Sequence, residues 1–167
     1  MDKYTSILAN RLYEDGTLAL EDVEVNLPDI ESQTYEIKAM GPVNVGLPGL
    51  FESMEMTIKA TGASKQYAQI SKFGTHNFIL TAAQQLVASD GKITPKQFKA
   101  EITAICKKIG GFGVIPGEAA EPESSYEVIK YKAYWDGELL WEVDKLNGKC
   151  EVCGTNYGDQ IGNLLNP

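Results

Sequence analysis

The sequence has little positive charge. Fifteen lysines and arginines stand against 23 aspartates and glutamates, so the formal net charge is −8. Proteins that bind nucleic acids need a basic surface that releases counterions from phosphate, and the densest basic position here is only Lys107-Lys108. The composition therefore argues against specific binding of DNA or RNA, and it also disfavours docking on an anionic membrane.

Long apolar runs are missing as well. A membrane-spanning helix needs about 18 or more consecutive apolar residues, and the most apolar segment, residues 78–88, is interrupted by Thr81, Gln84 and Gln85. The first ten residues lack a basic region followed by an apolar one, so no signal peptide is expected. The sequence predicts a protein without a membrane anchor.

Cysteine and histidine are scarce. Cys150 and Cys153 form a CxxC motif, but a zinc site needs four ligands, and only Cys106 and the single His76 are left to complete it. A thioredoxin-like redox motif would open a helix after a strand in a βαβ pattern, which is absent here. The favoured interpretation is three reduced thiols, and a scattered Cys₃His site is the alternative.

Motifs for catalysis are also lacking. His76 has no nucleophile motif around it, and the glycine-rich residues 110–113 lack the lysine of a phosphate-binding loop. Pairs of carboxylates for glycoside hydrolysis cannot be identified from spacing alone. We expect no enzymatic activity, no cofactor and no metal ion.

What is present is the composition of one ordinary domain. The chain has 167 residues, of which 43% are hydrophobic and 23% charged, close to the average of globular proteins. A chain of this length buries about 70% of its unfolded surface, so it needs no disulfide or metal for stability. Without an internal repeat or a long linker, residues 1–167 are predicted to form a single domain.

Alternation of apolar and polar residues predicts strands in the first part of the chain. The period-2 pattern covers residues 23–27, 35–39 and 54–60, and Asp15-Gly16 predicts a hairpin turn between residues 11–14 and 17–20. Ser64 is expected to cap a short helix that runs from residue 65 to about residue 72. A strand at residues 78–85 and a turn at Asp90-Gly91 follow.

Residues 41–52 are predicted to form a loop, because they contain three glycines and two prolines. Loops are normally polar, since they face water. This one instead carries five large apolar residues: Val43, Val45, Leu47, Leu50 and Phe51. Such a loop either folds back onto its own domain or is covered by another chain.

Residues 94–110 fit two structures. As a helix, the segment has Thr94 as N-cap, Pro95 at the first position, Gln97 completing a capping box and Gly110 as C-cap. As a strand, it alternates apolar and mostly polar residues, the apolar ones being Phe98, Ala100, Ile102, Ala104 and Cys106. The local signals favour the helix.

The C-terminal third begins with an acidic loop over residues 110–125. Residues 126–135 and 138–144 then form the clearest predicted hairpin, because Asp136-Gly137 tolerates the positive φ angles of a type I′ turn. Trp135 and Trp141 lie in its strands, and the tail, residues 157–165, is predicted to form a short helical turn. The whole pattern predicts a mainly β protein, a sandwich or barrel with one or two helices.

Several short motifs follow one another in a characteristic order. An acidic Gly117-Glu118 loop precedes the C-terminal series, which consists of Tyr126-Glu127-Val128, Tyr131-Lys132, Asp136-Gly137-Glu138, Glu142-Val143-Asp144 and Asn147. Earlier, Leu27-Pro28 ends a strand, residues 41–47 form a loop, and Met54-Glu55 opens the next strand. This order resembles the major tail tube protein family of contractile-tailed bacteriophages over most of residues 10–165. Cys153-Gly154 departs from it, because the family usually has Asn-Gly there.

The resemblance implies a single antiparallel β-sandwich or barrel with one flanking helix. Its expected parts are N-terminal strands with the apolar loop (10–62), a helix and strands (63–110), and an acidic loop, hairpin and tail (111–167). It also implies that residues 98–107 form a strand, since long-range sheet pairing can override local propensity.

The function implied by the resemblance is structural. Six-membered rings would stack into a hollow tube inside a contractile sheath, and DNA would pass through the lumen without specific binding. The expected partners are further copies of the chain and the tail sheath, tape-measure, baseplate and tail-terminator proteins. The protein would belong to the virion tail and assemble in the cytoplasm of the bacterial host.

Two sets of residues are candidates for roles in such a tube. Because DNA carries about one negative charge per 1.7 Å, an acidic lumen would let it slide, and the lumen-facing candidates are Glu36, Lys38, Glu55, Thr57 and Lys59. The apolar residues of segment 41–52 are the candidates for contact with a neighbouring subunit or ring.

Two other interpretations remain open. The chain could be the tube protein of a phage-tail-like bacteriocin or secretion apparatus, which carries no packaged DNA. It could instead be a monomeric β-sandwich module that binds carbohydrate. Trp135 and Trp141 would then stack on sugars from an exposed face, whereas in a tube subunit they belong to the core or to an interface.

Overall fold

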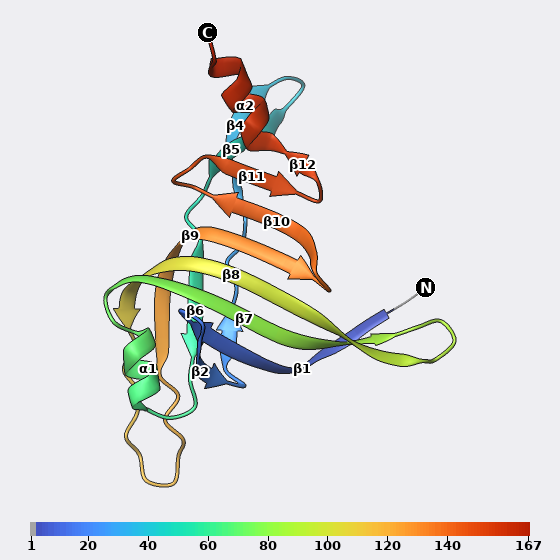
Figure 1. The fold of residues 1–167 in the computed structure, drawn as a ribbon. Coiled ribbons are helices and arrows are strands. Elements are labelled where there is room, and N and C mark those ends of the chain that lie inside the picture. The colour runs from blue at the N-terminus through green and yellow to red at the C-terminus, as the bar shows by residue number, and fades with distance from the viewer. Residues whose placement is uncertain (1–2) are drawn as a thin grey trace.

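The structure is a computed structural model, and it describes residues 3–167. Figure 1 shows the chain as a set of antiparallel strands with two short helices. The elements in chain order are β1 (Lys3–Glu14), β2 (Thr17–Glu21), β3 (Glu24–Asn26), β4 (Ser32–Lys38), β5 (Pro42–Phe51), β6 (Glu55–Lys59), α1 (Lys65–Ile70), β7 (Gly74–Val87), β8 (Ile93–Ile109), β9 (Glu123–Trp135), β10 (Glu138–Asp144), β11 (Lys149–Val152), β12 (Thr155–Asn156) and α2 (Tyr157–Leu165).

Most strands belong to one sheet that closes on itself. The sheet runs from β9 through β8, β7 and β1 to β2, and on the other side of β9 the strand β6 pairs with both β9 and β3. Only Asp22 and Val23 separate β2 from β3. The circuit β9–β8–β7–β1–β2/β3–β6 is therefore closed, which confirms the mainly β, barrel-like prediction. Beyond β9, the strands β10, β11 and β12 extend the sheet.

The corner between β2 and β3 is joined to β1 by the side chain of Asn10. Its amide Nδ2 donates to the carbonyl oxygen of Val23 at 2.7 Å, and its Oδ1 accepts from the Val23 amide at 3.0 Å. The backbone amide of Asp22, a residue with φ of 49°, donates to the Asn10 carbonyl. Asn10 thus continues the ladder of hydrogen bonds across a point where the backbone changes direction.

The predicted tight turns are confirmed. Asp15-Gly16 joins β1 to β2, and Asp136-Gly137 joins β9 to β10. All four residues have positive φ, from 48° at Asp136 to 86° at Gly137, as a type I′ turn requires. The strand predicted at residues 78–85 is the centre of β7, and the tail predicted at 157–165 is helix α2.

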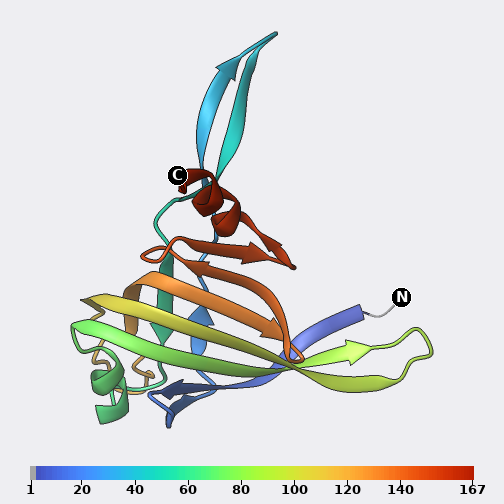
Figure 2. The ribbon, with the colours of Figure 1, turned by 45° about the horizontal axis from the view of Figure 1, so that its top comes forward.

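The predicted loop at residues 41–52 is wrong. Residues 42–51 form strand β5, which pairs with β4 in a separate two-stranded sheet. Because β4 is the one strand that pairs with β5 among the described residues, β5 is an edge strand. Glycine and proline are tolerated in it, since amides on the free edge need no strand partner. Figure 2 shows this hairpin extending away from the main sheet.

The helix that local signals favour at residues 94–110 is also wrong, and the strand implied by the family resemblance is confirmed. Strand β8 is hydrogen-bonded to β7 on one side and to β9 on the other. All of β7 pairs with residues 93–106. The hydrogen bonds to this neighbouring strand stabilise the extended form more than capping stabilises an isolated helix. Thr94 and Pro95 lie at the start of the strand instead of capping a helix.

The core lies inside the closed sheet. It contains the alternating residues predicted in 54–60, and β8 and β9 provide about half of the remainder; its largest fully buried side chains include Tyr126, Tyr131, Phe78, Leu12, Met54, Met56 and Ile58. Helix α1, capped by Ser64 as predicted, packs at one end. Three consecutive carbonyls at its C-terminus each accept a hydrogen bond from a different strand: Ile70 from Tyr126 Oη (2.6 Å), Ser71 from Cys106 Sγ (3.4 Å) and Lys72 from His76 Nε2 (2.6 Å).

Candidate assembly surfaces

The β4–β5 hairpin has two chemically different faces, and both are exposed. Residues that lie directly opposite in an antiparallel pair share a face, and the register pairs Tyr35 with Val45 and Ile37 with Val43. The opposite face carries Thr34, Glu36, Lys38 and Asn44. Tyr35 is 65% exposed and Val43 49%. An apolar strand face is thus presented to water, which single folded domains normally avoid.

The five predicted contact residues all lie on β5 but differ in exposure. Val43 and Val45 lie on the apolar face near the tip, and Leu50 is exposed near the base. Leu47 is half-buried, and Phe51 packs against the core of the main sheet. Sequence reasoning missed the partners of these residues on β4, Tyr35 and Ile37, although their alternation was visible.

A second exposed apolar region lies where β1, β7 and β8 project beyond the rest of the sheet, toward the N-terminus (Figure 2). Strand β2 pairs with β1 only from Arg11 onward, and Asn10 bonds to Asp22, so the outer edge of residues 3–9 is free of a strand partner among the described residues. Free edges pair readily with other chains. The exposed large apolar residues of this region are Tyr4, Ile7, Leu8 and Ile93, and no sequence pattern had indicated them.

The total accessible surface of the subunit is also larger than that of a compact monomer of the same mass. The accessible surface is 10686 Å², whereas a compact monomer of 18.3 kDa exposes about 8,100 Å². The excess is roughly 30%, or about 2,500 Å². This amount is comparable with the area buried in large protein–protein interfaces.

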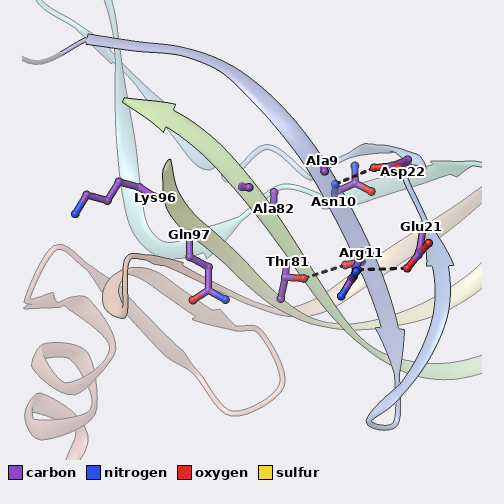
Figure 3. A pocket seen from close by; sticks show the side chains of 10 residues that line it. Ala9, Asn10, Arg11, Glu21, Asp22, Thr81, Ala82, Lys96 and Gln97 are labelled. Carbon is purple, nitrogen blue, oxygen red and sulfur yellow. Dashed lines mark hydrogen bonds and ion pairs between the residues drawn. The ribbon is translucent and has the colours of Figure 1, made fainter. Parts of the chain in front are cut away.

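The outer face of the main sheet is polar, with its charges paired. Lys132 lies 3.5 Å from Glu142 on the neighbouring strand, and Lys107 lies 3.0 Å from Glu55. A shallow groove across β1 and β7 (Figure 3) holds Arg11, whose Nε lies 3.3 Å from Glu21. Alanines and Thr81 also line this groove. The Lys107–Glu55 and Arg11–Glu21 pairs are exposed, so they make a solvated surface and contribute little to stability, whereas the Lys132–Glu142 pair is half-buried.

The structure separates the lumen-facing candidates into two groups. Glu55, Thr57 and Lys59 lie on the outer face of β6, within the main sheet, and Lys59 pairs with Glu121 at 3.3 Å. Glu36 and Lys38 lie on the polar face of the projecting hairpin, which is a different sheet. One continuous surface containing all five residues is therefore not formed within a subunit.

The cysteines and His76 are accounted for by packing. All three cysteines are free thiols, of which only Cys153 is exposed. Burial raises the pKa of the Cys106 and Cys150 thiols, which keeps them protonated and unreactive. His76 is buried between Glu14 and the Lys72 carbonyl. Among residues 3–167 no group of three or more histidines, cysteines or acids is placed to hold a metal ion.

Both tryptophans are half-buried. The Trp141 ring packs edge-on against Tyr131 in the core, and the Trp135 ring packs edge-on against Tyr4. The indole nitrogen of each is buried. The pair does not form the open stacking platform that a carbohydrate-binding module would use.

Exposed apolar residues on projecting strands, together with a surface larger than that of a compact monomer, are typical of a subunit of a larger assembly. The family model of the phage tail tube protein FII matches residues 5–165. The chain belongs to this family and is a structural subunit of a tail tube, a component of a phage or phage-like particle. The resemblance found in the sequence is thereby confirmed.

One similar solved structure is the cryo-EM structure of an extracellular contractile injection system, a PVC sheath-tube complex in the extended state. It is 13% identical to this chain, with a TM-score of 0.49, and the alignment covers 75% of this chain and 87% of the other. No curated protein matches the sequence. Within residues 3–167, none of the helices has the length and apolar character needed to cross a membrane.

Proposed function

We propose that six copies of this chain close into a ring and that the rings stack into a hollow tube without any catalytic activity. The observation that carries the proposal is the β4–β5 hairpin, whose apolar face is exposed and has no partner among residues 3–167 of the subunit. The partner of this face is a second copy of the chain. In a tail tube, the contacts within each ring and between stacked rings all form between identical subunits.

The magnitude of this contact can be worked out from the exposure of its residues. Burying a whole valine side chain stabilises by about 1.5–3 kcal/mol, so covering the exposed half of Val43 contributes about 1 kcal/mol in each subunit. A carboxylate at this position would have to be buried without a partner, which costs several kcal/mol. Six such contacts in a ring make assembly sensitive to a single substitution.

The lumen and the other partners are a further part of the proposal. The outer face of β6, with Glu55, Thr57 and Lys59, lines the conduit, and the net charge of −8 keeps DNA from adhering. The outside of the tube contacts a contractile sheath, as the tube does in the sheath-tube complex named above. Tape-measure, baseplate and terminator proteins act at the lumen and the ends, and assembly takes place in the host cytoplasm.

The test is negative-stain electron microscopy of the purified chain, with light scattering on the same sample. The wild-type protein is expected to form rings or tubes. Val43→Asp is expected to leave a folded subunit that does not assemble. Asn44→Asp is the matched control, because it adds the same charge at the next residue, on the polar face of the same hairpin.

Either of two results would count against the contact assigned to the hairpin. Tubes formed by Val43→Asp would show that the apolar face is not buried on assembly. Equal loss of tubes in both variants would show that added charge, and not the apolar face, is responsible. Circular dichroism of each variant checks that the subunit is folded.

A further inference from the structure

The C-terminal helix α2 is placed against the main sheet with unusually close backbone contact. A Cβ added at Gly158, in its first turn, would lie 2.3 Å from the carbonyl oxygen of Gly148 and 3.2 Å from the Cys150 nitrogen. Only glycine fits at such a distance. The start of the helix is therefore fixed on the turn between β10 and β11.

The same helix also contacts the base of the hairpin. A Cβ added at Gly49 of β5 would lie 2.6 Å from Cδ1 of Ile161. Gly158 and Ile161 are three residues apart and so lie on one face of α2. Figures 1 and 2 both show α2 beside the point where the hairpin leaves the main sheet. No residue of α2 is fully buried, and of its side chains that of Tyr157 packs against the core, so the rest of the helix contributes little to the core of the domain.

The segments that connect the hairpin to the main sheet are irregular. Residues 27–31 and 52–54 lie outside helices and strands. The main sheet holds the residues nearest to it: the Met54 carbonyl accepts from the Val128 amide at 2.8 Å, and the Ser53 hydroxyl donates to the Glu127 carboxylate at 2.7 Å. At the base of the hairpin itself, the Glu52 amide donates to the Glu31 carbonyl at 2.8 Å, and Lys145 Nζ donates to the Glu52 carbonyl at 2.6 Å. A hairpin attached through two such segments can pivot unless a further contact holds it.

We propose that α2 is a brace that sets the direction of the hairpin, with Ile161 as the positioning residue. This rests on the proposed function, in which the hairpin carries the contact between subunits. A hairpin held in one direction before assembly loses less conformational freedom when it meets its neighbour, and such preorganisation increases affinity. The brace thus favours assembly without itself touching the neighbour.

The experiment measures the direction of the hairpin in the unassembled subunit. Nitroxide labels are placed on Cys153, the exposed native thiol, and on Met40→Cys at the fully exposed hairpin tip. The Val43→Asp background, or dilution, keeps the subunit unassembled. Pulsed electron paramagnetic resonance then gives the distribution of distances between the two labels.

Ile161→Ala is expected to abolish the single narrow distance peak of the parent protein. Leu164→Ala, the control, removes a comparable side chain from the same helix at an 85% exposed position, and it is expected to keep the peak. Gly158→Ala displaces the helix from its seat and is expected to act like Ile161→Ala. In assembling protein, Ile161→Ala is expected to raise the critical concentration for tubes by about tenfold.

The outcomes separate the brace from the proposed function. A narrow peak in both Ile161→Ala and Gly158→Ala would overturn the brace, whether or not tubes form. A broad peak in these variants supports the brace, even where the wild-type chain forms no tubes. The absence of tubes from the wild-type chain would instead overturn the proposed function. A broad peak already present in the parent protein would show that nothing holds the hairpin, and it too would overturn the brace.

Discussion

Removing the side chain of Asn10 is expected to open the corner at which the main sheet closes. Asn10→Ala deletes the two hydrogen bonds, of 2.7 and 3.0 Å, that join this side chain to the backbone of Val23. Val23 is only 4% exposed, so water cannot freely replace the lost partners. The amide and carbonyl of Val23 are then left buried without hydrogen bonds.

The size of the effect follows from these two groups. A buried donor or acceptor left without a partner costs about 1–3 kcal/mol. Because both hydrogen bonds are part-buried, each group should cost about 1–2 kcal/mol, and the free energy of unfolding should fall by about 2–4 kcal/mol. With a urea dependence of about 2 kcal/mol per molar, the unfolding midpoint should fall by roughly 1–2 M. The measurement is urea unfolding of the subunit followed by circular dichroism, in the non-assembling Val43→Asp background.

Asn26→Ala is the matched control for this substitution. Its side-chain amide donates to the Thr57 hydroxyl at 3.1 Å, but the residue is exposed, so water replaces the lost contact. The expected loss is below about 0.5 kcal/mol. Equal losses in Asn10→Ala and Asn26→Ala would refute the argument that the Asn10 side chain closes the sheet.

Three further predictions concern the turn, the tyrosines and the lumen. Cys153 has φ of 47° before Gly154, so Cys153→Asn is expected to raise the free energy of unfolding by about 0.5–1 kcal/mol; an unchanged or lower unfolding midpoint in urea would contradict this. Burial raises the pKa of Tyr131 to about 12 and that of Tyr126 further, so both stay neutral when folded but ionise near pH 10 when unfolded. Stability should therefore be intact below pH 10 and fall above it by up to about 1.4 kcal/mol per pH unit for each tyrosine, and Tyr131→Phe should flatten the fall measured by urea unfolding. In assembled tubes of a Cys153→Ser background, Glu55→Cys is expected to react with a small maleimide but not with a bulky polymer-linked one, and equal rates would exclude it from the lumen.

Local structure in this chain could be predicted where neighbouring residues decide it. Asp15-Gly16 and Asp136-Gly137 form the expected turns because their backbone tolerates positive φ with any partner strands. Ser64 caps α1 because a serine hydroxyl can reach the amide of Tyr67 three residues later. The alternation at residues 54–60 identified core positions, since period 2 places them all on one face.

The candidate site could be predicted only in part. The apolar character of residues 43–51 was visible in the sequence, and so was the need for something to cover them. The registry that places Val43 and Val45 beside Ile37 and Tyr35 was not visible, because it depends on which strand pairs with which. The contact between Ile161 and Gly49 joins residues more than a hundred positions apart, and no local pattern indicates it.

The sequence by itself therefore determined the Asp-Gly turns, the Ser64 cap of α1, the core positions within residues 54–60 and the family to which the chain belongs. These depend on short-range sterics, on hydrogen bonds within a few residues and on the order of motifs. The tertiary structure decided against the helix that the local signals favoured within residues 93–109, where only the family resemblance had implied a strand, and it alone decided that residues 42–51 form one strand of a projecting hairpin. A strand gains its hydrogen bonds from partners distant in the chain, so its stability depends on the assembled sheet and not on its own residues.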